Sequence, residues 1–236
     1  MNVISKGQKP LKIDIWTDFL CPFCYLTTLR VQRLAQIIPV EVTARAFMLR
    51  PHDAPPLPED FRGIVEAEYE RIGYDIAAEF DLQIAPGPVG LRTYAAHLAS
   101  KLAQGEGIGL EFHRAVMRAY WLEGLSIDDA DVLMRIGKSV GAKRSVVAND
   151  QMMACADAAL RADQEAALAY AARSAPLLVF DERIILRGAV SFDTMLKAAT
   201  DATCTDLAGK SSCVKLPDWT GYSFQGSGQQ IPRRVE

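Results

Sequence analysis

The sequence predicts an α/β protein whose one mixed sheet is interrupted, along the chain, by a block of helices. A strand–helix–strand unit comes first, because residues 12–17 and 40–47 alternate apolar and polar side chains around a helical stretch at 25–38. Nearly every segment from 59 to 172 then has the apolar spacing of a helix. Two short apolar runs and a last helical stretch complete the pattern, at 177–180, 183–186 and 191–199.

Prolines mark the limits of the first unit. Pro22 stands at the start of the predicted helix, where its missing N–H has no partner within the helix in any case. Pro39 separates this helix from the second strand. The proline-rich stretch 48–58 is typical of a loop that leaves the unit.

Glycine and proline divide the central block into separate helices. The breaks fall at 85–88, at 105–109 and at 124–125. Between and around them we expect helices at 59–74, 91–103, 110–123, 128–139, 143–149 and 152–172.

The last part of the chain returns to the sheet. Asp181 and Glu182 separate the two apolar runs at a spacing typical of a hairpin, and Ser191 is a suitable N-cap for the final helix. Beyond about residue 204 the chain becomes polar and rich in glycine. We therefore divide the sequence into a first sheet part, a helical insertion, a second sheet part and a tail, at 11–58, 59–172, 173–203 and 204–236.

Composition excludes several classes of protein. Half of the 236 residues are hydrophobic and 23% are charged, which is ordinary for a globular protein. The net charge of −3 leaves no basic excess for binding nucleic acid. No apolar run approaches the roughly 18 residues of a membrane span. Residues 1–16 contain no apolar core of a secretory signal, so we expect a cytoplasmic protein without a membrane partner.

Cys21 and Cys24 carry the chemistry that the sequence predicts. Two cysteines separated by Pro22 and Phe23 at a helix start can close a small disulfide. The unpaired N–H groups and the dipole of the helix favour a thiolate there. We therefore expect the pKa of Cys21 to fall from about 8.5 into the range of roughly 3.5–7.5. Cys24, one turn into the helix, is expected to be more buried and to act as the resolving thiol.

The other cysteines leave alternatives open. Cys204 and Cys213 could form a second disulfide that relays electrons, or stay two free thiols. With the first pair they could also complete a four-cysteine zinc site, but they lie far along the chain without the spacing of such sites, so we predict no metal. Cys155 lies in an alanine-rich helical stretch and is expected to be a small buried side chain.

The segment 13–25, with the sequence IDIWTDFLCPFCY, resembles the active-site segment of DsbA-like thioredoxin-fold proteins. The resemblance is greatest to the cytoplasmic FrnE-type subgroup. It implies a thioredoxin fold with a large helical insertion, in agreement with the order of elements predicted above. The resemblance spans about residues 12–202.

A cis-proline opposite the dithiol is a further implication of this resemblance. Ala175-Pro176, directly before the strand at 177–180, matches the family's position. The cis bond would present the backbone of Ala175 to an extended substrate chain, which it could bind as a strand does. The sequence departs from the family in having Ala175 instead of a bulkier β-branched residue, and Phe23 where Trp or His is common.

Two more residues near the dithiol are candidates for function. Asp14 lies within the first strand. It is either a buried carboxylate that accepts the proton of Cys24, or a solvated one on a strand edge. Phe23, at the exposed start of the helix, is expected to contribute an apolar surface that binds unfolded peptides.

The sequence therefore predicts a thiol–disulfide oxidoreductase. Its expected partners are proteins with thiols or disulfides, or glutathione, and its redox centre is the dithiol, so no cofactor is required beyond glutathione as a co-substrate. One alternative is a glutathione-dependent isomerase or a kappa-type glutathione transferase, which have the same insertion but no complete cysteine pair. A second is a protein that binds metal or unfolded chains without catalysis.

Overall fold

β1 lies at the centre of the sheet and has a neighbouring strand on each side. The computed structural model describes residues 9–147, 150–204, 222–224 and 230–232. The first unit contains β1 (Leu11–Thr17), α1 (Pro22–Ala35) and β2 (Val40–Ala46). The insertion contains α2 (Glu59–Phe80), α3 (Tyr94–Gly105), α4 (Gly109–Trp121), α5 (Ala130–Ser139) and α6 (Asp150–Ala169). The last elements are β3 (Leu177–Phe180), β4 (Ile184–Arg187), α7 (Phe192–Cys204), β5 (Tyr222–Phe224) and β6 (Gln230–Pro232).

The main sheet has the strand order β2-β1-β3-β4. β1 is parallel to β2 and antiparallel to β3, so that Ile15 lies between Ala44 and Leu178. β3 and β4 form the hairpin that the sequence predicts. The mixed sheet and its helical insertion confirm the predicted fold class.

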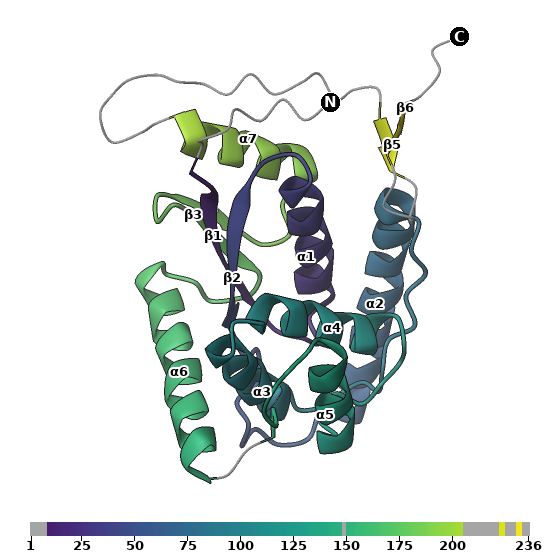
Figure 1. Cartoon of the computed structure of the whole chain (residues 1–236). Helices are drawn as coiled ribbons and strands as arrows, with labels where there is room; N and C mark the ends of the chain where they lie inside the picture. Colours follow the sequence, from purple (N-terminus) through teal and green to yellow (C-terminus); the bar gives the residue numbers. More distant parts are fainter. Residues whose placement is uncertain (1–8, 148–149, 205–221, 225–229, 233–236) are drawn as a thin grey trace.

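Alternation along β1 assigns one face of the sheet to each layer of helices. Ile13 and Ile15 pack in one core with residues of α1 and α7, whereas Trp16 packs in another with Ala167 of α6. Figure 1 shows α1 and α6 on opposite sides of the strands, with α7 at one end of the sheet and α3, α4 and α5 at the other. The insertion therefore covers the end of the sheet where β1 finishes.

Most predicted helix ends differ from the structure by a few residues, and two helices differ more. α2 continues to Phe80 rather than ending near 74, because Ile72, Ile76 and Phe80 keep the spacing of a buried helical face. The helix predicted at 143–149 is wrong for the residues described there, 143–147, which form no helix. The carboxylate of Glu106 accepts hydrogen bonds from the backbone N–H groups of Lys143 and Arg144, at 2.7 and 3.0 Å, which holds this stretch as a loop.

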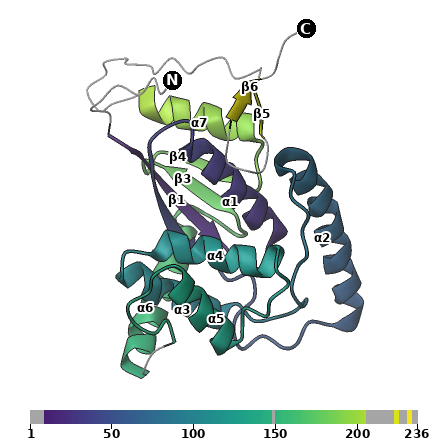
Figure 2. The same cartoon turned by 45° about the vertical axis from the view of Figure 1, so that its right-hand side comes forward.

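Arg30 joins α1 to α2. Its guanidinium donates to both carboxylate oxygens of Glu79, with a shortest distance of 2.6 Å, and to the carbonyl of Val190 at 2.8 Å. Arg33, one turn further along α1, lies 3.7 Å from the same carboxylate. A guanidinium that donates to both oxygens of a carboxylate fixes the relative orientation of the two side chains as well as their separation. This contact therefore holds α2 beside α1, as Figures 1 and 2 show.

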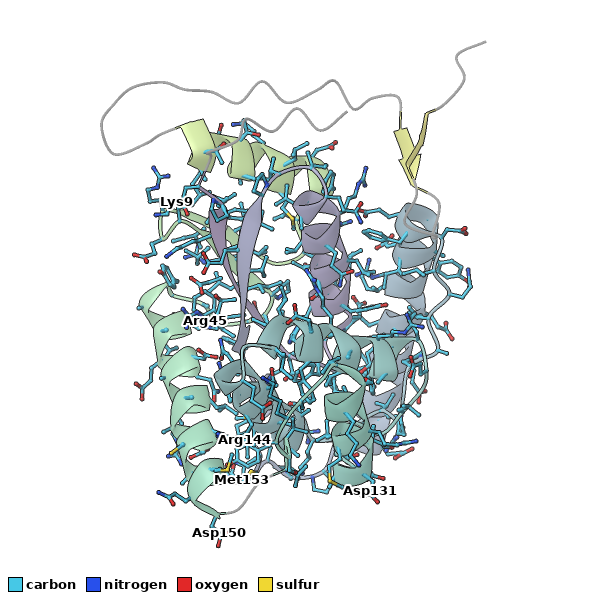
Figure 3. The ribbon with its side chains drawn as sticks, viewed as in Figure 1. Lys9, Arg45, Asp131, Arg144, Asp150 and Met153 are labelled. Carbon is cyan, nitrogen blue, oxygen red and sulfur yellow. The ribbon has the colours of Figure 1, made fainter. Side chains whose placement is uncertain are left out.

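A buried ion network attaches the sheet to the insertion. Asp163 of α6 forms an ion pair with Lys101 of α3, and their side chains are only 5% and 6% exposed. The same carboxylate accepts from the backbone N–H of Ala46 at 2.7 Å and from Arg45 at 3.2 Å. The indole N–H of Trp16 donates to the carbonyl of Asp163 at 2.7 Å. Figure 3 shows Arg45 on the side of β2 that faces α6.

We expect Asp163→Asn to lower the free energy of unfolding by roughly 3–5 kcal/mol, because the variant leaves the ammonium of Lys101 buried without its counter-charge. Urea denaturation followed by circular dichroism measures this change. The matched control is Asp157→Asn on the same helix. Asp157 pairs with Arg161, whose side chain is 72% exposed, and the loss of such a pair costs about 1 kcal/mol or less. Equal effects of the two variants would contradict a structural role of the buried pair.

Candidate active site

The dithiol lies where α1 begins, at the junction of sheet and insertion. Cys21 is the N-cap residue of α1, with extended backbone, and Pro22 follows at the first helical position. The backbone N–H groups of Cys24 and Tyr25 donate to the carbonyl of Cys21, at 3.0 and 3.1 Å. Both thiols are free and buried, Cys21 at 4% and Cys24 at 0% exposure. Figure 2 shows this end of α1 directed at α4.

Side chains of the insertion hold the two residues before Cys21. The indole N–H of Trp121 donates to the carbonyl of Phe19 at 2.9 Å. The hydroxyl of Tyr69 donates to the carbonyl of Leu20 at 3.0 Å and lies 3.2 Å from the hydroxyl of Tyr120. These contacts join α2 and α4 directly to the backbone that presents the first cysteine.

Asp18 is the buried carboxylate of the site. Its Oδ1 accepts from the N–H of Leu20 at 3.0 Å, and its Oδ2 accepts from the N–H of Leu49 at 2.8 Å and from the hydroxyl of Thr93 at 3.3 Å. Burial raises the pKa of Asp18, since the loss of solvent outweighs the opposing effect of these three hydrogen bonds. One carboxylate therefore joins the turn before the dithiol to the loop after β2 and to the start of α3.

The buried thiol of Cys24 ionises less readily than an ordinary thiol. Burial raises the pKa of Cys24 well above its usual value, and the hydrogen bond to Cys21 and the charge of Cys21 raise it further. The charge of Asp18 acts in the same direction, whereas a backbone hydrogen bond from Asp18 opposes it. Cys24 therefore keeps its proton at neutral pH, as a resolving thiol does before it reacts.

The peptide bond between Ala175 and Pro176 is cis, which confirms the conformation that the family resemblance implied. The Sγ of Cys21 lies 3.9 Å from the carbonyl oxygen of Ala175, so the cis-proline segment faces the dithiol. The carbonyl of Pro176 accepts from the N–H of Gly188 at 2.9 Å, which joins this segment to the end of β4.

Asp14 lies in neither of the two environments that the sequence suggested. It occupies the central strand, yet its side chain is 21% exposed and its carboxylate accepts from Arg45 at 2.7 Å. The carboxylate whose charge acts on Cys24 is that of Asp18, three residues before Cys21. The position of Asp18 close to the dithiol in the sequence was the signal that could have identified it. Alternation along the strand directed attention to Asp14 instead.

The remaining predicted residues have mixed outcomes. Phe23 packs against the core of the insertion while partly exposed, and the guanidinium of Arg71 lies 5.4 Å from the centre of its ring. Its role in docking stays a prediction. Cys155 is exposed, contrary to the expectation of a buried thiol. Cys204 ends α7 and Cys213 lies outside the described residues, so their pairing stays a prediction.

Two buried histidines pack against Phe19, in the turn before Cys21. The rings of His97 and His113 lie 4.7 and 5.0 Å from the ring of Phe19. Burial lowers the pKa of both histidines to about 3, so that they stay neutral at physiological pH. They pack the site without contributing charge to it. Within the described ranges, no group of three or more His, Cys, Asp or Glu residues could hold a metal ion.

A dithiol at a helix start, opposite a cis-proline on a mixed sheet, defines a thioredoxin-fold protein with a helical insertion. Residues 12–199 match the family model of the DSBA-like thioredoxin domain, and the chain belongs to this family. None of the helices in the described part of the chain combines the length and the apolar character needed to cross a membrane.

Several known proteins are similar to this chain. The uncharacterized protein YwbO of Bacillus subtilis (strain 168) is 25% identical over 138 residues, which cover 55% of this chain and 66% of YwbO, just under two thirds of its length. A probable DsbA oxidoreductase from Streptomyces coelicolor has a TM-score of 0.65 at 22% identity, with 94% of this chain and 100% of that chain covered.

Two further solved structures share the fold. The cytosolic disulfide reductase DsbM from Pseudomonas aeruginosa, solved with GSH, has a TM-score of 0.59 at 16% identity, covering 81% of this chain and 95% of that chain. A 2-hydroxychromene-2-carboxylate isomerase has a TM-score of 0.65 at 19% identity, covering 82% and 96%. At these identities the likeness concerns the fold, which is therefore shared by proteins with different activities.

We expect iodoacetamide to modify Cys21 before Cys24 in the reduced, folded protein. The raised pKa of Cys24 keeps this thiol protonated as the pH rises through the range in which ordinary thiols ionise, and a protonated thiol reacts poorly. Peptide mapping by mass spectrometry after timed alkylation between about pH 6 and pH 9 measures the order. Cys155, which is exposed, serves as the internal reference for an unhindered thiol. Modification of Cys24 ahead of Cys21 would reverse the assigned roles.

Proposed function

We propose that this protein is a thiol–disulfide oxidoreductase that acts through Cys21 and Cys24. The observation that carries the proposal is the pair itself: two free thiols at a helix start, facing a cis-proline segment. Burial, which raises the pKa of the second thiol, supports it. Membership of the DSBA-like family supports this class of chemistry. The dithiol stores the two electrons, so we propose no resident cofactor.

The proposed reaction is disulfide exchange in two steps. The thiolate of Cys21 attacks one sulfur of a substrate disulfide; a bond forms between these two atoms, and the other substrate sulfur leaves as a thiolate that takes up a proton. Cys24 then gives up its proton and attacks the Sγ of Cys21, which releases the first substrate sulfur as a second thiol. The substrate gains two electrons and two protons, and the protein is left with a Cys21–Cys24 disulfide. The reverse sequence oxidises a substrate dithiol.

The proton of Cys24 needs an acceptor in the second step, and we assign this role to Asp18 in place of Asp14. Asp18 is buried, and its charge acts on Cys24. Its raised pKa makes it a stronger base than an ordinary carboxylate when it is ionised. As the pH falls through this raised pKa, Asp18 becomes protonated and can no longer accept, so exchange is expected to slow toward acid pH.

The backbone of Ala175 supplies the proposed contact with substrate. Its carbonyl oxygen lies 3.9 Å from the Sγ of Cys21. An extended chain whose sulfur reacts with Cys21 could therefore hydrogen-bond beside it in the manner of an added strand. Proteins with thiols or disulfides are the partners that we propose, in the cytoplasm, where the similar DsbM acts according to its description as a cytosolic disulfide reductase.

Glutathione-dependent isomerisation is the second candidate function, because an isomerase shares this fold and a similar reductase was solved with GSH. The complete cysteine pair argues against it, since activation of glutathione does not need a resolving thiol. The candidates differ in one variant: Cys24→Ala should lose reductase turnover, whereas an isomerase would keep its activity and bind glutathione tightly.

We expect the reduced protein to reduce the disulfides of insulin, with turnover lost in Cys21→Ser. In Cys24→Ala the first step remains possible and the second does not, so a mixed disulfide at Cys21 should accumulate. Turbidity of the released insulin B chain measures the first effect, and non-reducing electrophoresis with mass spectrometry measures the second. Cys155→Ser is the matched control, because Cys155 is an exposed thiol on α6. Reduction that survives Cys21→Ser would overturn the proposal.

We expect Asp18→Asn to slow the resolution of the mixed disulfide by roughly tenfold or more near neutral pH, with the deficit shrinking as hydroxide replaces the missing base. Stopped-flow release of a fluorescent thiol across pH measures the profile. A purely structural role of Asp18 would lower the rate equally at every pH. The matched control is Asp14→Asn, which should keep the wild-type profile. Faster resolution in Asp18→Asn would mean that the lost negative charge matters more than the lost base.

A further inference from the structure

A cavity of about 360 Å³ lies next to the dithiol, between the loop after β2, the first half of α2 and the start of α3. Leu20, the residue directly before Cys21, forms part of its wall, and Asp18 and Thr93 also line it. Most of the remaining wall is apolar and comes from three segments: Leu49, Leu57, Phe61, Val65, Val89 and Leu91. The volume lies within the range of pockets that bind a specific group.

The polar groups of the cavity are bound to the protein itself. Asp18 accepts from Leu20, Leu49 and Thr93, as described above. Arg92 donates to the carbonyls of His52 and Ala54. Arg50 donates to the carbonyl of Pro55, which together with Arg92 fixes the loop that forms one wall. The cavity thus offers mainly apolar surface to an occupant.

Large apolar side chains are exposed at the edge of this cavity. Leu49 is 45% exposed and Phe61 is 47% exposed, and both belong to the lining. Exposed apolar surface that continues into a pocket marks a site for an apolar partner. Leu20 directly precedes Cys21, so the wall of the cavity includes the residue next to the reacting cysteine in the sequence.

We propose that this cavity binds a bulky apolar side chain of a polypeptide whose own cysteine is exchanging with Cys21. The inference rests on the proposed function and names its preferred substrates: polypeptide cysteines flanked by a large apolar residue. Glutathione is expected to gain less from this cavity, because Arg50 and Arg92 in the wall already donate to backbone carbonyls and most of the remaining wall is apolar. It can still exchange at Cys21, but without the added binding of an apolar group.

A pair of disulfide-linked peptides tests the proposal. The two peptides are identical except for Phe or Ser beside the cysteine, and glutathione disulfide is the third substrate. The second-order rate constant for oxidation of the reduced, full-length protein is measured by the loss of free thiol. We expect the Phe peptide to react at least about tenfold faster than the Ser peptide, the usual scale of discrimination by an apolar pocket.

Two matched variants test whether the preference for the Phe peptide arises in the cavity. Phe61→Ser removes an exposed part of the wall and should bring the ratio of the two peptide rates close to one. Ile64→Ser changes a side chain on the same helix that is 62% exposed and does not line the cavity, and should keep the wild-type ratio. Equal rates for both peptides in the wild type, or an unchanged ratio in Phe61→Ser, would overturn the subsite.

A second measurement needs no change in the cavity. The mixed disulfide of Cys24→Ala with a peptide that carries 4-fluorophenylalanine beside its cysteine should show a ¹⁹F resonance shifted from that of the free peptide, with nuclear Overhauser contacts to the lining side chains. An unshifted resonance would overturn the subsite while leaving disulfide exchange in place. Failure of Cys21 to react with any of the three substrates would instead overturn the proposed function, and the subsite with it.

Discussion

The site depends on the buried carboxylate of Asp18. Its two oxygens take three hydrogen bonds from Leu20, Leu49 and Thr93, which belong to segments far apart in the sequence. A carboxylate without water is costly unless its hydrogen bonds are made, so these three segments must stay together for the folded state to form. The position of the dithiol, the shape of the adjacent cavity and the start of α3 therefore share one constraint.

The insertion contributes to the site as well as covering the sheet. Trp121 and Tyr69 hold the carbonyls of Phe19 and Leu20, and the network around Asp163 attaches the same insertion to β1 and β2. The helices are thus held both at the reacting turn and at the sheet.

Local features of the sequence were sufficient for the dithiol, the first strand–helix–strand unit and the hairpin of β3 and β4, because each depends on spacing within a short segment. Pro176 needed the family resemblance, since nothing in its neighbourhood requires a cis bond. The sequence directed attention to Asp14 instead of Asp18. Alternation along a strand predicts which side of the sheet a side chain faces, but not its partner, which for Asp14 is Arg45. The cavity and the hydrogen bond of Trp121 arise from contacts between segments far apart in the sequence. Trp121 and Phe19, for example, are 102 residues apart. No local pattern of residues contains such contacts.

The ion pair between Arg30 and Glu79 has a consequence for how the protein would recognise substrates. It holds α1, which starts at the reacting sulfur, against α2, which carries the wall residues Phe61 and Val65. This ion pair limits sliding of the two helices past each other, and so limits changes in the distance between the Sγ of Cys21 and the apolar wall. Recognition would then depend on where the large residue stands in the partner's sequence relative to its cysteine, and the same residue moved further along the chain would gain nothing.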